Sequence, residues 1–230
     1  SLHYLAWHRA STAPYRGDRE VRLLLRLVLA LTVLCTAALY AYAEFPSLPQ
    51  AFRAAAFNVV AAITTSGFTT TGFAHWSGAL PLLMILLGFI GGCAGSTTGG
   101  LKLQRVAIML HVGTRELRQL IHPHGHFVVR AGGRPVAEEA MRAVAGFVTL
   151  YLASLLLFTL ALAGCGLDLV SAFTGAASSL NNFGPALGVG AVHFAHASDA
   201  ATGILTVAML TGRLEVFTLL VLLTPAFWRE

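Results

Sequence analysis

Two long apolar runs mark the two halves of this chain. The first extends from Val21 to Ala43 and is interrupted only by Arg22 and Arg26 near its start. The second extends from about Ala140 to Gly164, with Arg142 at the corresponding end. Each run is long enough to cross a bilayer as a helix, and long cationic side chains near a helix end can reach the polar interface. The pattern predicts two membrane-spanning helices.

A shorter apolar segment follows each run, Pro49 to Ile63 in the first half and Asp168 to Ser179 in the second. Segments of roughly 12 to 15 residues do not cross a bilayer, so we expect re-entrant helices. Pro49 and Asp168 suit helix N-termini, where a missing N–H is harmless and a carboxylate is favourable. Each short helix would direct the negative end of its dipole towards the membrane centre, where it stabilises a cation.

A polar knot that contains a glycine ends each short segment, and an apolar segment returns after it. We name residues 63–68 (ITTSGF) the first knot and residues 180–185 (LNNFGP) the second knot. The returning segments are about Ala79 to Met109 and Thr202 to Trp228. Unpaired backbone groups in hydrocarbon cost several kcal/mol each unless protein or a water-filled cavity satisfies them. One knot could be a polar kink or an extracellular turn, but two at matched positions predict a pore.

The two halves align when Gly67 is placed over Gly184, an offset of 117 residues that keeps all segments in the same order. Hydrophobic residues make up 56% of the chain and charged residues 11%. Soluble domains carry roughly 25% charged residues, so this composition indicates an integral membrane protein. The chain begins with Ser1, and the segment before the first span lacks the features of a secretory signal, so we expect a piece of a longer protein.

The net charge of +5 follows the topology, since the basic residues are not gathered on an aromatic-studded soluble domain as nucleic-acid binding would need. Of the 15 Lys and Arg residues, 11 precede the first span or lie between the halves: Arg9, Arg16, Arg19, Arg22, Lys102, Arg105, Arg115, Arg118, Arg130, Arg134 and Arg142. The positive-inside rule places both segments in the cytoplasm, so each half starts inside, goes out and returns. We expect an all-α membrane protein with two parallel helix–pore-loop–helix repeats.

The chain divides into four parts on this basis. They are a cytoplasmic N-terminal segment (residues 1–20), a first repeat (21–110), a basic cytoplasmic connector (111–137) and a second repeat (138–230). The glycine-rich stretch Ala131 to Arg134 predicts a short hairpin in the connector, between Phe127 and Val136.

The knots have the chemistry of a filter for a monovalent cation. Backbone carbonyls can replace the hydration shell of such an ion, and a glycine at positive φ lets an extended chain turn its carbonyls towards one axis. Neither knot contains a carboxylate, which favours potassium or sodium over a divalent cation. Hydroxyls in the first knot and amides in the second could line the strand or hold it from behind. The candidate ion-binding residues are Thr64, Thr65, Ser66, Gly67, Asn181, Asn182, Phe183 and Gly184.

Residues 91–100, here named the gate loop, interrupt the first returning segment with five glycines. Interior glycines each cost a helix about 0.5–1 kcal/mol, so we expect a non-helical loop just inside the filter that can block or open the path. Close helix packing through small residues is the alternative. A phosphate-binding loop is excluded, because Leu101 separates Gly100 from Lys102 and Leu103 follows the lysine.

The offset of 117 residues places Arg213 opposite Ser96 of the gate loop. An arginine within an apolar helix is expensive and usually functional or paired. Arg213 could donate to gate-loop carbonyls and present a positive barrier to cations; alternatively it reaches the interface or pairs with Glu215. The candidate gate residues are Gly91, Gly92, Gly95, Ser96, Thr97, Thr98, Gly99, Gly100 and Arg213.

Four segments in the same order carry a family resemblance: TTSGFTTTGF, GGCAGSTTGG with LKLQR, SLNNFGPALG, and TGRLEVFTLLVLLTPAFW. They resemble the C-terminal half of the TrkH and KtrB type bacterial potassium transporters. The resemblance implies that this chain holds the third and fourth of four repeats, half of a four-repeat potassium-channel-like pore. Each knot would then be one quarter of the filter, and the gate loop the gate beneath it.

The resemblance also implies partners and a location. The N-terminal half of the same subunit would supply the first two repeats, the subunit would form a homodimer, and a cytosolic TrkA-type nucleotide-binding ring would regulate it. The protein would be a multi-pass component of the bacterial inner membrane, with K⁺ as the transported ion and no tightly bound cofactor.

Two other functions remain to be weighed against potassium uptake. A secondary carrier for another cation or small solute also uses discontinuous helices, although commonly in inverted repeats. An enzyme is not expected, because no span holds a cluster of acid, base, nucleophile or metal ligands. His122, His124 and His126 could bind a transition metal, but a solvated loop is the preferred interpretation, and no transition-metal site is expected.

Overall fold

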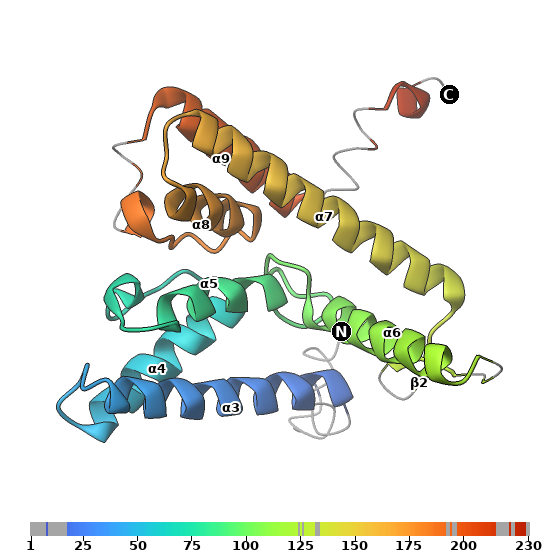
Figure 1. Cartoon of the computed structure of the whole chain (residues 1–230), viewed down its shortest axis with the longest axis horizontal. Helices are drawn as coiled ribbons and strands as arrows, with labels where there is room; N and C mark the ends of the chain where they lie inside the picture. The colour runs from blue at the N-terminus through green and yellow to red at the C-terminus, as the bar shows by residue number, and fades with distance from the viewer. Residues whose placement is uncertain are drawn as a thin grey trace.

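The helices of the protein form two similar groups (Figure 1). The computed structural model describes residues 8, 18–123, 125, 127–131, 134–191, 194, 197–214, 221 and 224–228. The first group contains α3 (Arg19–Ala41), α4 (Leu48–Ile63) and α5 (Leu80–Ile90), and the second contains α7 (Glu138–Gly164), α8 (Leu169–Leu180) and α9 (Asp199–Arg213). Within each group a long helix is followed by a short helix, a knot and a returning helix, as the repeat predicted.

Local sequence explains where these helices begin. The side chain of Asp18 caps α3 by accepting from the backbone N–H of Glu20 at 2.7 Å. Asp168 caps α8 by accepting from the N–H of Ser171 at 3.1 Å. The helix α4 carries a proline in its first turn, where the missing N–H removes no helical hydrogen bond.

Small side chains let the short helices pack closely against their neighbours. Ala51, Ala55 and Ala62 of α4 are fully buried, as are Ala172 and Ala176 of α8. The short helices contact both other helices of their own group, and α5 meets α8 between the groups, where the core is continuous. Such close approach of small residues is typical of helices packed in membranes.

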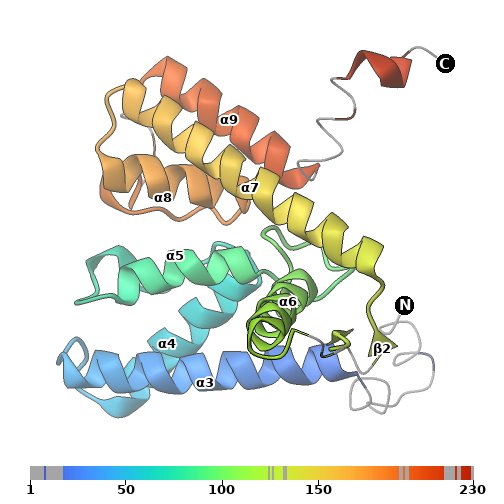
Figure 2. The same cartoon turned by 45° about the vertical axis from the view of Figure 1, so that its right-hand side comes forward.

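The gate loop separates two helices that point in different directions. α5 ends at Ile90 and α6 (Leu103–Ile121) begins after Lys102. In Figure 2, α5 lies across the view whereas α6 points towards the viewer. The predicted break in the returning segment is therefore present, but α6 also leaves the line of α5, which the sequence did not indicate.

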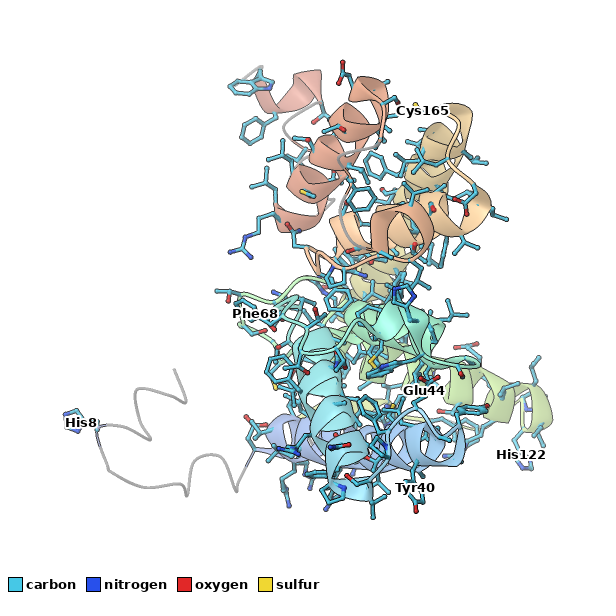
Figure 3. All side chains as sticks on the ribbon, turned by 90° about the vertical axis from the view of Figure 1, so that its left-hand side faces the viewer. His8, Tyr40, Glu44, Phe68, His122 and Cys165 are labelled. Atoms are coloured by element: carbon cyan, nitrogen blue, oxygen red, sulfur yellow. The ribbon has the colours of Figure 1, made fainter. Side chains whose placement is uncertain are left out.

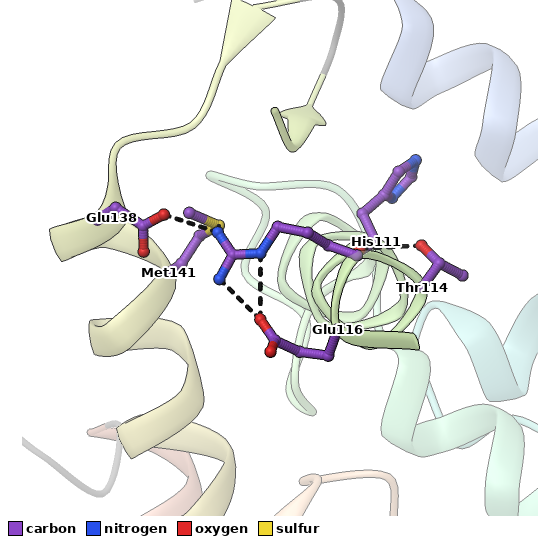
Figure 4. Close-up of polar contacts among 6 residues, drawn as sticks. His111, Thr114, Glu116, Glu138 and Met141 are labelled. Carbon is purple, nitrogen blue, oxygen red and sulfur yellow. Dashed lines mark hydrogen bonds and ion pairs between the residues drawn. The ribbon is translucent and has the colours of Figure 1, made fainter. Parts of the chain in front are cut away.

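The connector ties α6 to α7. Arg115 of α6 bonds Glu116 at 2.8 Å and Glu138 of α7 at 2.7 Å (Figure 4). The predicted hairpin is confirmed as β1 (Arg130–Ala131) paired antiparallel with β2 (Arg134–Pro135). These contacts fix the start of the second repeat relative to the helix that follows the gate loop.

Two described helices, α3 and α7, are long and apolar enough to cross a membrane. They expose large apolar side chains, among them Leu25 and Leu29 on α3 and Leu157 and Leu160 on α7. A surface of this kind suits lipid or apolar protein rather than water.

The end of the second returning segment is described only in part. α9 ends at Arg213 with Leu214 as its C-cap. Glu215 and the residues up to 220 lie outside the described residues, and a short 3₁₀ turn, η3 (Pro225–Trp228), follows.

Candidate ion filter and gate

The first knot begins as a helix end with two reinforcing hydrogen bonds. Thr64 is the C-cap of α4, and Thr65 follows in the left-handed region with φ 49°. The N–H of Thr65 donates to Ala62 at 3.1 Å and the N–H of Ser66 donates to Ala61 at 3.0 Å. This pair of bonds is the Schellman motif. A β-branched residue rarely adopts positive φ, and strain of about 1–3 kcal/mol persists only where the surroundings impose it.

The second knot repeats this geometry residue for residue. Asn181 is the C-cap of α8 and Asn182 has φ 50°. The N–H of Asn182 donates to Ser179 at 3.0 Å and the N–H of Phe183 donates to Ser178 at 2.9 Å. The offset of 117 residues found in the sequence therefore relates matching hydrogen bonds and matching left-handed residues, not only matching residue types.

The glycines of the two knots also match. Gly67 has φ +74° and Gly184 has φ +100°, so both positions favour glycine. A methyl group added to Gly67 would overlap the carbonyl oxygen of Phe183. The two knots therefore meet backbone to backbone, and beyond them the space around Gly67, Thr69 and Gly184 forms a cavity of about 270 Å³. Phe68, at the end of the first knot, is 70% exposed and lies at the surface (Figure 3).

Side chains of the second knot attach it to the surrounding helices. Asn181 is 1% exposed, and its Oδ1 accepts a hydrogen bond from the Tyr151 hydroxyl of α7. Asn182 Nδ2 donates to the carbonyl of Met209 in α9 at 3.2 Å. Both amides thus hold the knot to neighbouring helices. Sequence reasoning missed Tyr151, because its hydroxyl is one of several in the apolar run of α7.

Hydroxyls of the first knot bond to backbone instead. Thr64 Oγ1 donates to the carbonyl of Val60 at 2.7 Å, and Ser66 Oγ contacts the carbonyl of Ala61 at 3.5 Å. Thr65 Oγ1 accepts from the N–H of Gly99 in the gate loop at 3.0 Å. The gate loop is therefore bonded directly to the first knot.

The gate loop is folded on itself and touches both knots. Gly92 N–H donates to Thr98 Oγ1 at 2.9 Å, and the hydroxyls of Ser96 and Thr98 lie 2.6 Å apart. A methyl group added to Gly99 would overlap the carbonyl oxygen of Asn181 in the second knot. Gly99 therefore donates a hydrogen bond to Thr65 of the first knot and packs against the backbone of the second knot.

Arg213 reaches the gate loop from the end of α9. Its Nη1 donates to the carbonyl of Thr97 at 2.8 Å. The neighbouring Gly212 packs so closely on α8 that a methyl group there would overlap the carbonyl of Leu180. The gate loop, Arg213 and Tyr151 line a cavity of about 120 Å³.

Lys102 also lines this cavity and adopts φ 68°, and the sequence did not indicate that it lies beside the gate loop. The alternative partner of Arg213, Glu215, lies outside the described residues, as do His124 and His126. Within the described residues, no three His, Cys, Asp or Glu side chains gather as a metal site.

Matched pore loops that meet between two long apolar helices define a membrane protein with a repeated pore-loop architecture. The chain belongs to the TrkH family of cation transport proteins, which matches residues 21–229. It is 42% identical to the Trk system potassium uptake protein TrkH of Vibrio parahaemolyticus and also 42% identical to that of Escherichia coli K12. Both alignments cover the whole of this chain, but only 48% of the Vibrio protein and 47% of the Escherichia coli protein. Trk system potassium uptake protein TrkG of Escherichia coli is 31% identical over 47% of its length.

The solved potassium transporter TrkH from Vibrio parahaemolyticus has the same fold. Its crystal structure superposes with a TM-score of 0.93 at 42% identity, covering 99% of this chain and 49% of that one. The chain thus spans about half the length of the relatives it matches, and the expected family and fold are confirmed.

Proposed function

We propose that this chain supplies two quarters of a potassium filter and its gate, in a subunit that takes up K⁺ across the bacterial inner membrane. The observation that carries the proposal is the pair of knots, which share left-handed residues and hydrogen bonds and meet at Gly67 and Phe183. The relatives are named as potassium uptake proteins, which supports the choice of ion.

The filter acts through its backbone. Carbonyl oxygens of residues 64–67 and 181–184 replace the water around K⁺, and no charged side chain holds the ion so tightly that it cannot leave. The bonds of Asn181 and Asn182 to α7 and α9 keep the second quarter rigid. The C-terminal ends of α4 and α8 add their negative partial charge at the knots.

The gate loop closes the path below the filter. Gly99 fills the space between Thr65 and the Asn181 carbonyl, and Arg213 holds the loop through Thr97. The positive charge of Arg213 beside the path adds an electrostatic barrier to K⁺. Opening requires the loop to leave the knots and Arg213 to release the Thr97 carbonyl.

The other half of the subunit completes the ring. The chain matches only 48% of the length of TrkH from Vibrio parahaemolyticus. An open apolar groove lies beside the first knot and is lined by Phe52, Phe57 and Phe68 among others. The first two repeats of the same subunit would cover this groove. On the family resemblance, we further propose a homodimer and a cytosolic TrkA-type nucleotide-binding ring as regulator.

Complementation tests this function. The full-length subunit, with its regulatory partner, should restore growth at low K⁺ to a bacterium that lacks its own potassium uptake systems. Failure to restore K⁺ uptake despite normal membrane expression would overturn the proposal and favour a carrier for another cation or small solute.

A further inference from the structure

The tip of the gate loop is attached to the first turn of α3 as well as to residues near the knots. The tip is a tight turn, in which the N–H and hydroxyl of Ser96 donate to the carbonyl of Cys93 at 3.1 and 2.7 Å. The N–H of Ala94 points out of this turn and donates to Glu20 Oε1 at 2.7 Å. Glu20 lies 74 positions earlier in the chain, in the first turn of α3.

The start of α3 fixes the position of Glu20. The carboxylate of Asp18 accepts from the N–H of Glu20 at 2.7 Å and from that of Val21 at 3.4 Å. The backbone of Glu20 is therefore held by the helix cap, and its own carboxylate is stabilised by the positive end of the helix dipole.

We propose that Glu20 is a positioning residue that latches the tip of the gate loop to the cytoplasmic end of α3. The inference rests on the proposed gating role of the loop. A bond of 2.7 Å from a backbone N–H to a carboxylate has the length of a charge-assisted hydrogen bond. The loop must break it to leave the path.

The latch and Arg213 hold the loop from the two different repeats. Arg213 of α9 donates to the carbonyl of Thr97, whereas Glu20 of α3 accepts from the N–H of Ala94. A change in the separation of α3 and α9 must therefore strain or break one of the two attachments. The closed loop thus couples α3 of the first repeat to α9 of the second, and a movement of α3 alone is sufficient to release the tip.

The second repeat provides a matched control. Glu139 also lies in the first turn of a long span, α7, and within the described part of the chain it makes no polar contact. Glu139→Ala removes the same charge from the same kind of helix end without touching the gate loop. Its neighbour Glu138 is unsuitable, because it bonds Arg115.

Cys93 supplies the readout, because it lies in the loop tip. The full-length subunit, with Cys93 as its only cysteine, is reconstituted in liposomes together with its regulatory partner. A membrane-impermeant thiol reagent is applied to the cytoplasmic face, and the rate of Cys93 modification is measured beside the K⁺ flux. Glu20→Ala should raise both roughly fivefold, which is about 1 kcal/mol at 1.4 kcal/mol per factor of ten.

Further variants separate the hydrogen bond from charge and from misfolding. Glu20→Gln keeps an acceptor oxygen without the charge and should fall between wild type and Glu20→Ala, because a neutral acceptor forms a weaker hydrogen bond. Glu20→Met keeps the length of the side chain without an acceptor and should behave like Glu20→Ala. Glu139→Ala should change neither quantity.

Each alternative outcome is decisive. A conducting wild type whose modification rate and flux are unchanged in both Glu20→Ala and Glu20→Met would overturn the latch. An equal increase in Glu20→Gln or in Glu139→Ala would assign the effect to charge and overturn it as well. A wild type that carries no K⁺ would refute the proposed function, while the Cys93 modification rates would still report whether Glu20 holds the loop.

Discussion

Replacing Gly99 by alanine should displace the gate loop from its contacts with the two knots. The added methyl group would overlap the carbonyl oxygen of Asn181, which belongs to backbone that is itself fixed by the Schellman bonds of the second knot. Neither partner is the end of a flexible side chain, so the loop must move away. In doing so it loses the bond from the N–H of Gly99 to Thr65 Oγ1.

The size of the effect follows from these two losses. Overpacking against rigid surroundings costs about 1–3 kcal/mol. A typical intramolecular hydrogen bond contributes about 1 kcal/mol net. The closed position of the gate loop is therefore destabilised by about 2 kcal/mol or more. This raises the ratio of displaced to closed loop by at least roughly thirtyfold.

Basal K⁺ flux into proteoliposomes that contain the full-length subunit measures this shift. Gly99→Ala should increase the flux in the absence of any activating signal. Gly113→Ala is the matched control, because a methyl group there meets nothing within 4 Å on a regular helix. Unchanged flux in Gly99→Ala, with normal insertion and the same melting temperature as the control, would refute the contact between gate loop and knot.

Three further predictions concern Arg213, the glycines of the knots and the cap of α8. Arg213→Ala removes the donor to the Thr97 carbonyl and should raise basal flux roughly fivefold, the effect of about 1 kcal/mol; flux equal to wild type would exclude the arginine from the gate. Gly67→Ala should lower K⁺ over Na⁺ selectivity more than Gly184→Ala, since both change a residue at positive φ but only the first overlaps backbone; the reverse order in bi-ionic flux would contradict the geometry. The hydroxyl and N–H of Ser171 hold the pKa of Asp168 below its ordinary value of 3.8 in the folded protein. The stabilisation of α8 by this cap is therefore complete at pH values above 3.8, and it is lost as the pH falls through the lower pKa of the folded state. The melting temperature of the protein in detergent should therefore fall in that acidic window, and less so in Asp168→Asn; an identical pH profile in the variant would remove the cap from the account.

Sequence periodicity predicted the elements that depend on local chemistry. Helix α8 begins one residue after Asp168, because a carboxylate caps the first turn. The offset placed Thr65 over Asn182, and both adopt the left-handed conformation at a helix end. The glycines of the gate loop predicted the end of α5, because too little helix propensity remains there.

Contacts between distant segments could not be predicted in the same way. Glu20 has the sequence signature of an acid in the first turn of a helix, and its bond to Ala94 depends on where α3 lies relative to the gate loop. Tyr151 has no sequence feature that identifies Asn181 as its partner. The turn of α6 away from α5 depends on packing against α7 and the connector, which a pattern within one helix does not encode.

The proposed function requires the two knots to be quarters of one potassium filter. Anomalous diffraction from crystals of the full-length subunit grown with Rb⁺ in place of K⁺ tests it most directly. An anomalous peak is expected between the backbone carbonyls of residues 64–67 and 181–184. Peaks confined to other parts of the protein, in a preparation that still transports Rb⁺, would contradict it.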